Sequence, residues 1–201
     1  RFPTPGVPPM ISPRFRYAFE YAAAIHAADL RKGAKIPYLS HLLEVCAIVM
    51  RYGGNEDAVI AALLHDAAED HGGTPRLVDI QRNFGKTVAS IVEECTDTTS
   101  RPKESWEVRK RNYVKHVPNA SRGGLLVSAA DKLANVRAIL ADHYVLGDEV
   151  YKRFKRPKRR TLWYYNALSR AFTAHFPGDL AKELRRTVAE LNRVSKYKPG
   201  R

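Results

Sequence analysis

The chain has 201 residues, 44% hydrophobic and 27% charged, and its 34 basic and 21 acidic residues leave a formal net charge of +13. A chain of this size and composition is typical of one globular domain with a core of its own. No apolar stretch is long enough to span a membrane, and the two isolated cysteines exclude a disulfide framework and a Cys-x-x-Cys metal pair. We therefore expect a cytoplasmic protein with reduced thiols. The basic charge favours an anionic partner without choosing among nucleotides, nucleic acid and acidic surfaces.

Apolar residues recur at helical spacing along nearly the whole chain. They predict helices over residues 15–30, 41–52, 56–71, 74–84, 86–95, 106–116, 125–140, 161–175 and 179–194. Ser40 and Thr74 are expected to cap the helices that follow them, and Gly33 is placed to allow a left-handed turn. No strand alternation of convincing length and no internal repeat is present. We expect an all-α, single-domain helical bundle over residues 14–195, with a flexible leader at 1–13 and a flexible basic tail at 196–201.

The predicted helix 56–71 collects one histidine and three acids within six residues. The i, i+4 spacing places His65 over Glu69 and Asp66 over Asp70, beside the apolar run that precedes them. Neighbouring carboxylates repel one another, and burying them without partners is costly. A metal cation would satisfy the ligands and lower their pKa values. This stretch therefore predicts a metal site whose other ligands lie elsewhere in the chain.

Two residues outside this helix are candidates for those ligands. His41 opens one predicted helix, and Asp131 lies inside the apolar run of another. An aspartate in such a run needs a partner, which is either the metal or the adjacent Lys132. Four other histidines are interpreted as surface or satisfied core side chains: His26, His116, His143 and His175. His71 is interpreted as a cap at the end of its helix.

Two further acids, Glu69 and Asp70, could act on a water molecule bound to the metal. A divalent cation lowers the pKa of bound water and neutralises phosphate charge. Glu69, one turn after His65, is placed to orient or deprotonate that water, and Asp70 to hold the hydrogen-bond network. The alternative is that both acids only form salt bridges at the helix end.

Four segments together resemble a known family. They are Arg31-Lys32-Gly33 with Tyr38-Leu39-Ser40-His41, the stretch His65 to Asp70, Trp106 to Lys110, and Ala130 to Asn135. His41, His65-Asp66 and Asp131 are similar to the H…HD…D pattern of HD-domain metal-dependent phosphohydrolases. The order of the segments resembles most closely the hydrolase domain of RelA/SpoT-type proteins and the small single-domain alarmone hydrolases.

The resemblance implies an HD-domain helical bundle that holds one Mn²⁺ on His41, His65, Asp66 and Asp131. It implies hydrolysis of the 3′-diphosphate of ppGpp or pppGpp, with release of pyrophosphate and GDP or GTP. Glu69 and Asp70 would be the catalytic acids. The substrate would be a small nucleotide rather than nucleic acid or a membrane.

The substrate contacts are also expectations. They are Arg31, Lys32, Arg109, Lys110, Lys132, Asn135 and Tyr164, although aromatic residues spaced like Tyr164 more often pack in a core. No strong motif fixes the purine, so ppApp-type alarmones and the 2′-phosphate of NADPH are alternative substrates. Another HD phosphohydrolase, such as a nucleotidase, and a non-catalytic nucleotide- or RNA-binding module are the alternative functions.

Overall fold

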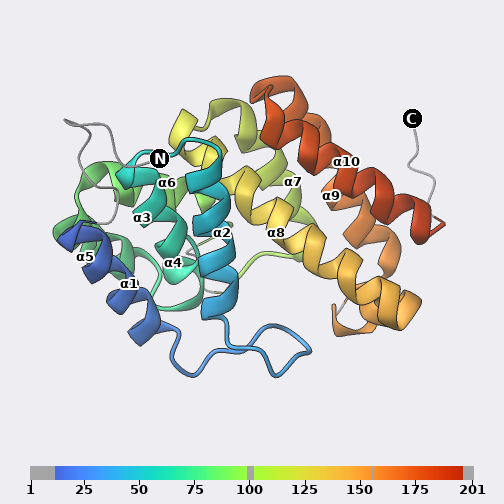
Figure 1. Ribbon diagram of the computed structural model, residues 1–201, viewed down its shortest axis with the longest axis horizontal. Helices are drawn as coiled ribbons and strands as arrows, with labels where there is room; N and C mark the ends of the chain where they lie inside the picture. Colours follow the sequence, from blue (N-terminus) through green and yellow to red (C-terminus); the bar gives the residue numbers. More distant parts are fainter. Residues whose placement is uncertain (1–11, 99–101, 155, 197–201) are drawn as a thin grey trace, which may run out of the picture.

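The computed structural model describes residues 12–98, 102–154 and 156–196, and it is built from helices (Figure 1). In chain order they are α1 (Pro13–Ile25), α2 (Leu39–Arg51), α3 (Glu56–Leu64), α4 (Ala67–Asp70), α5 (Thr74–Phe84), α6 (Lys86–Cys95), α7 (Trp106–His116), the 3₁₀ helix η1 (Val117–Asn119), α8 (Arg122–Leu146), the 3₁₀ helix η2 (Gly147–Arg153), α9 (Lys158–His175) and α10 (Asp179–Val194). Within the described ranges no strand forms, and only one isolated bridge pairs Leu30 with Pro37. The predicted all-α, single-domain fold is confirmed.

Two helices with apolar residues on nearly every side form the centre of the bundle. Every residue of α3 from Ala58 to Leu64 is buried, as is the stretch of α8 from Gly124 to Asp131. A helix that is hydrophobic all round must be covered on all sides. Accordingly α8 packs against α2, α3, α6, α9 and α10. None of the helices in the described ranges combines the length and apolarity needed to cross a bilayer.

The predicted helix 56–71 is wrong as one continuous element. It divides into α3 and α4, and His65 and Asp66 lie at the break between them. Asp66 has φ −97° and ψ −7°, in the bridge region where active-site residues are often found. The stretch from His65 to Asp70 is therefore not part of one uninterrupted helix.

Three further local predictions differ from the structure. The first helix begins at Pro13 and ends at Ile25 instead of Leu30, because the backbone of His26 leaves the helical region. Ser40 does not cap α2, since its hydroxyl bonds to the carbonyl of Pro37, and Gly73, not Thr74, precedes α5. Residues 1–11 of the expected leader and 197–201 of the expected tail lie outside the described residues.

Gly33 has the left-handed conformation that the sequence predicts. Its φ is +73°, and a Cβ at this position would lie 2.8 Å from Cβ of Arg153 in η2. Gly33→Ala should therefore lower the free energy of unfolding by about 1–2 kcal/mol, measured by urea titration. Gly178→Ala is the matched control, because Gly178 has extended backbone (φ 162°) and open space around it. Equal stabilities of the two variants would contradict this account.

Candidate metal centre and adjoining cleft

Four side chains from three separate segments converge beside the break between α3 and α4. His41 comes from α2, His65 and Asp66 from the break, and Asp131 from α8. His65 Nε2 lies 3.0 Å from Asp66 Oδ2, and His41 Nε2 lies 3.1 Å from Asp131 Oδ1. The crossed distances, His41 to Asp66 and His65 to Asp131, are 3.8 and 3.7 Å between the same atoms. Each Nε2 atom therefore lies within 3.8 Å of an oxygen of both aspartates, and the donor atoms of His41, His65 and Asp66 all lie within 4.8 Å of one another.

Neighbouring groups hold these donors in the orientation that a metal requires. The Nδ1 atom of His65 lies 2.8 Å from the carbonyl oxygen of Ala62 and donates to it, which directs Nε2 at the cluster. The Tyr38 hydroxyl donates a hydrogen bond to Asp66 Oδ2. The Nε2 atoms of His41 and His65 are buried and have no hydrogen-bond partner. Buried polar atoms are seldom left in this state, so their orientation is that of a pair of metal ligands.

The electrostatics of the cluster favour positive charge at its centre. Burial alone would lower the pKa of His65, but the charges of Asp66 and Asp131 outweigh it and hold that pKa well above its usual value. Burial likewise opposes ionisation of Asp131, yet Lys132 and His65 hold its pKa well below the usual range. Both carboxylates are thus ionised, and the imidazoles lie where a cation is stabilised.

The residues present fit a divalent metal ion. Two imidazole nitrogens and two carboxylate oxygens form a mixed donor set that suits first-row transition metals. Asp131 can bind a metal and pair with Lys132 at the same time, because its Oδ1 faces the imidazoles while its Oδ2 is 2.5 Å from Lys132 Nζ. Asn135 also donates to Asp131 Oδ1. These outer contacts orient the carboxylate toward the metal position.

Tyr38→Phe should weaken binding of the metal ion by about 10–100-fold, because the variant loses the hydrogen bond that orients Asp66. Titration calorimetry with Mn²⁺ measures this affinity. Tyr17→Phe is the control, since the Tyr17 hydroxyl is exposed and lies 3.4 Å from Asn83. An unchanged affinity in Tyr38→Phe would show that this hydroxyl does not support the metal centre.

Two adjoining cavities open beside the metal centre. The larger, of about 600 Å³, is lined in part by His41 and Asp70, and the smaller has a volume of about 370 Å³. All seven side chains predicted to contact a substrate line one or both cavities. Arg31 lines the larger, Arg109, Lys110, Lys132 and Tyr164 line the smaller, and Lys32 and Asn135 line both. These volumes are in the range of small-molecule sites.

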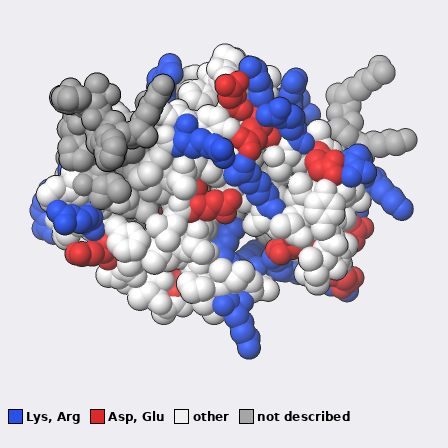
Figure 2. Space-filling model, viewed as in Figure 1, with Lys and Arg blue, Asp and Glu red and all other residues white. Residues whose placement is uncertain are grey.

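The cations of the cleft are spread over several elements. On the face drawn in Figure 2, basic side chains gather across the middle and upper right of the molecule, with a few acidic ones among them. Arg109 and Lys110, on α7, both pair with Asp97, and Lys110 Nζ lies 5.1 Å from the ring centre of Tyr164. The Tyr164 hydroxyl is buried without a hydrogen-bond partner. The cleft therefore offers cations and a polar aromatic surface together.

The two predicted catalytic acids lie in different surroundings. Glu69 accepts a hydrogen bond from the backbone N–H of Asp97 at 3.2 Å and pairs with Lys103 at 3.1 Å. Asp70 lines the larger cavity, and desolvation together with the charges of Asp66 and Glu69 raises its pKa to about 6. Glu69 thus makes the salt bridge of the alternative interpretation, while Asp70 faces the cleft.

Sequence reasoning assigned no role to several residues of the site. Phe154 and Tyr165 line both cavities, and Trp106 lines the smaller one. Tyr38 could have been noticed, because it lies three residues before His41, directly ahead of a predicted helix. Phe154 follows η2, a short helix without a periodic apolar pattern, so no signal marked it.

Comparisons with known proteins agree with this geometry. The family described as HD domain matches residues 18–155. The guanosine-3′,5′-bis(diphosphate) 3′-pyrophosphohydrolase MESH1 of Xenopus tropicalis is 42% identical over 123 residues, which are 60% of this chain and 66% of the relative. The structure of lmo0812 from Listeria monocytogenes EGD-e has a TM-score of 0.66 and 30% identity, and covers 78% of this chain and 99% of that one.

A second solved structure shows the same fold at lower identity. It belongs to a metazoan orthologue of SpoT described as hydrolysing ppGpp, with a TM-score of 0.75, 24% identity, and coverage of 92% of this chain and 98% of that one.

The chain spans just under two thirds of the length of the Xenopus relative. The matched range 18–155 contains His41, His65, Asp66 and Asp131, the four candidate metal ligands. The chain therefore belongs to the HD-domain family.

Proposed function

We propose that this protein is a Mn²⁺-dependent hydrolase that removes the 3′-diphosphate of ppGpp or pppGpp, releasing pyrophosphate and GDP or GTP. The observation that supports the proposal most strongly is the four-donor cluster beside a cleft lined by Arg31, Lys32, Arg109, Lys110 and Lys132. A polyanionic nucleotide requires this combination of a metal and several cations. The MESH1 relatives carry the name of this activity.

The metal would be held by His41, His65, Asp66 and Asp131. When bound, a divalent cation polarises the scissile phosphate and supplies a water of lowered pKa. Tyr38 holds Asp66, and Lys132 with Asn135 holds Asp131, so these contacts maintain ligand geometry while the substrate binds.

Glu69 and Asp70 would together position and activate the attacking water. Lys103 and the Asp97 backbone fix the carboxylate of Glu69, which restricts it to one orientation. Asp70 lines the larger cavity, and its pKa, raised to about 6 by desolvation and by the charges of Asp66 and Glu69, lets it either donate or accept a hydrogen bond near neutral pH. We assign proton transfer to Glu69 and support of the hydrogen-bond network to Asp70.

The two cavities would divide the nucleotide between them. Arg31 lies 5.6 Å from the Tyr38 ring centre and donates to Asn135, so it presents a planar cation in the larger cavity. Arg109, Lys110 and Tyr164 in the smaller cavity would bind the phosphates.

The substrate would be encountered in the cytoplasm, where the buried free thiols Cys46 and Cys95 remain reduced.

The test incubates the purified protein with Mn²⁺ and ppGpp, pppGpp, ppApp or NADPH in parallel, and resolves products by anion-exchange chromatography. We expect pyrophosphate and GDP from ppGpp. Preferred turnover of ppApp or NADPH would change the substrate, and release of orthophosphate from simple nucleotides would favour a nucleotidase. No turnover of any substrate would overturn the proposal and favour a binding module.

A further inference from the structure

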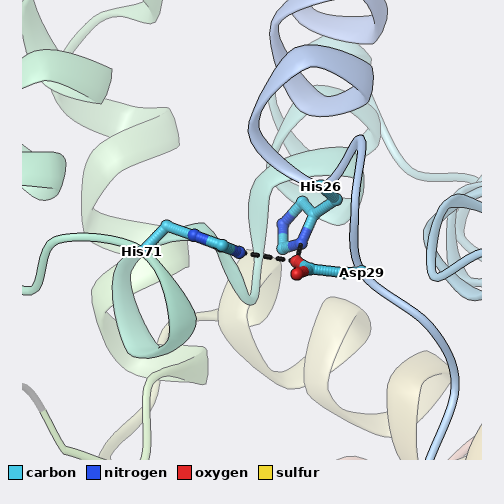
Figure 3. A group of neighbouring side chains, drawn as sticks. All are labelled: His26, Asp29 and His71. Carbon is cyan, nitrogen blue, oxygen red and sulfur yellow. Dashed lines mark hydrogen bonds and ion pairs between the residues drawn. The ribbon is translucent and has the colours of Figure 1, made fainter.

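A second group of metal-ligating side chains lies outside the four-donor cluster. His26 caps the end of α1, Asp29 lies in the loop that follows, and His71 caps the end of α4 (Figure 3). His26 Nδ1 is 2.7 Å and His71 Nε2 is 2.5 Å from Asp29 Oδ2, and one donor atom of each residue lies within 4.8 Å of the others. Figure 3 shows both imidazoles directed at the carboxylate from different segments.

The surrounding structure holds these donors in place. His26 is 2% exposed, and its ring stacks on Tyr38 with centres 5.2 Å apart. Arg76 donates from Nε to the carbonyl oxygen of His71 and from Nη1 to the Tyr21 hydroxyl on α1. The group is thus assembled before any ion binds, which lowers the entropy cost of binding.

The group is also accessible and correctly charged. The side chains of Asp29 and His71 are 32% and 33% exposed, so an ion can enter and keep water on its open positions. Burial lowers the pKa of His26 and keeps the imidazole neutral, the form that binds metals, although Asp29 opposes the shift. The hydrogen bond with His71 lowers the pKa of Asp29 and favours the carboxylate.

We propose that His26, Asp29 and His71 form a second metal site, which binds Zn²⁺ or a similar borderline divalent ion with solvent on the remaining positions. Two imidazole nitrogens and one carboxylate suit such ions, whereas Mg²⁺ and Ca²⁺ prefer oxygen ligands throughout. The ion would join the end of α1 to the end of α4. It would therefore stabilise the fold by mass action, independently of catalysis.

The experiment counts Zn²⁺ ions by native mass spectrometry after dialysis against Zn²⁺ alone. Wild type should bind two, His71→Ala one, His65→Ala one, and the double variant none. In the His65→Ala background, Zn²⁺ should still raise the melting temperature, and adding His71→Ala should abolish that rise. His143→Ala is the matched control, because His143 pairs with Asp148 (3.2 Å) outside both groups of candidate ligands and should leave two ions.

The count separates this proposal from a simple hydrogen-bonded cluster. The same number of ions in His71→Ala as in wild type would overturn it, and so would loss of an ion in His143→Ala with none lost in His71→Ala. If His71→Ala fails to fold by circular dichroism, the near-isosteric Asp29→Asn replaces it. Asp29→Asn should bind one Zn²⁺ ion, and two bound ions would overturn the proposal.

Discussion

Replacing His65 with alanine should abolish tight binding of Mn²⁺ and lower kcat/KM for ppGpp by about 10³-fold or more, because the bound ion contributes several kcal/mol to the transition state. His65 is 1% exposed, and its bond to the Ala62 carbonyl directs Nε2 at both carboxylates. Titration calorimetry and steady-state kinetics measure the two losses.

The matched control is His143→Ala, which removes a histidine outside the metal centre and should preserve both properties. Circular dichroism of His65→Ala checks that the helices persist, since the buried imidazole also fills space. A variant that kept the wild-type rate with Mn²⁺ would refute the assignment of the four-donor cluster as the catalytic centre.

Glu69→Gln should lower kcat by about 10²–10⁴-fold, the usual contribution of a general base, while leaving Mn²⁺ affinity unchanged. The amide oxygen of glutamine can still accept the hydrogen bond from the Asp97 backbone, so the local structure should survive. Stopped-assay chromatography of ppGpp turnover measures kcat, and calorimetry measures the affinity for the ion.

Glu190→Gln is the control, because Glu190 pairs with Arg193 on the surface of α10. A wild-type kcat in Glu69→Gln would mean that Glu69 only forms the salt bridge with Lys103. Loss of Mn²⁺ binding would instead make Glu69 a ligand or a support of the metal centre. The three outcomes assign three different roles to this carboxylate.

Most of the helical fold follows from local patterns. The bounds of α7 and α10 agree with the prediction, because Ser105 accepts a hydrogen bond from the first turn of α7 and Pro177-Gly178 ends the preceding segment. Local sequence patterns could not predict the break at His65–Asp66, because the residues around it favour a helix. Tertiary contacts of the two side chains, not local propensity, decide where α3 ends.

The candidate metal centre can be proposed from residue types in the sequence, and the second cluster cannot. The acids beside His65, and Asp131 in an apolar run, indicate a cation because buried charges need partners. His26 and His71, 45 positions apart, form no such pattern, so the sequence indicates only a surface or core side chain for His26 and a helix end for His71. The sequence by itself thus determined the helices and the donor types, through periodicity and the cost of buried charge. Only the packing of α2, α3 and α8 decided which of these donors meet, because distances between segments depend on the whole core.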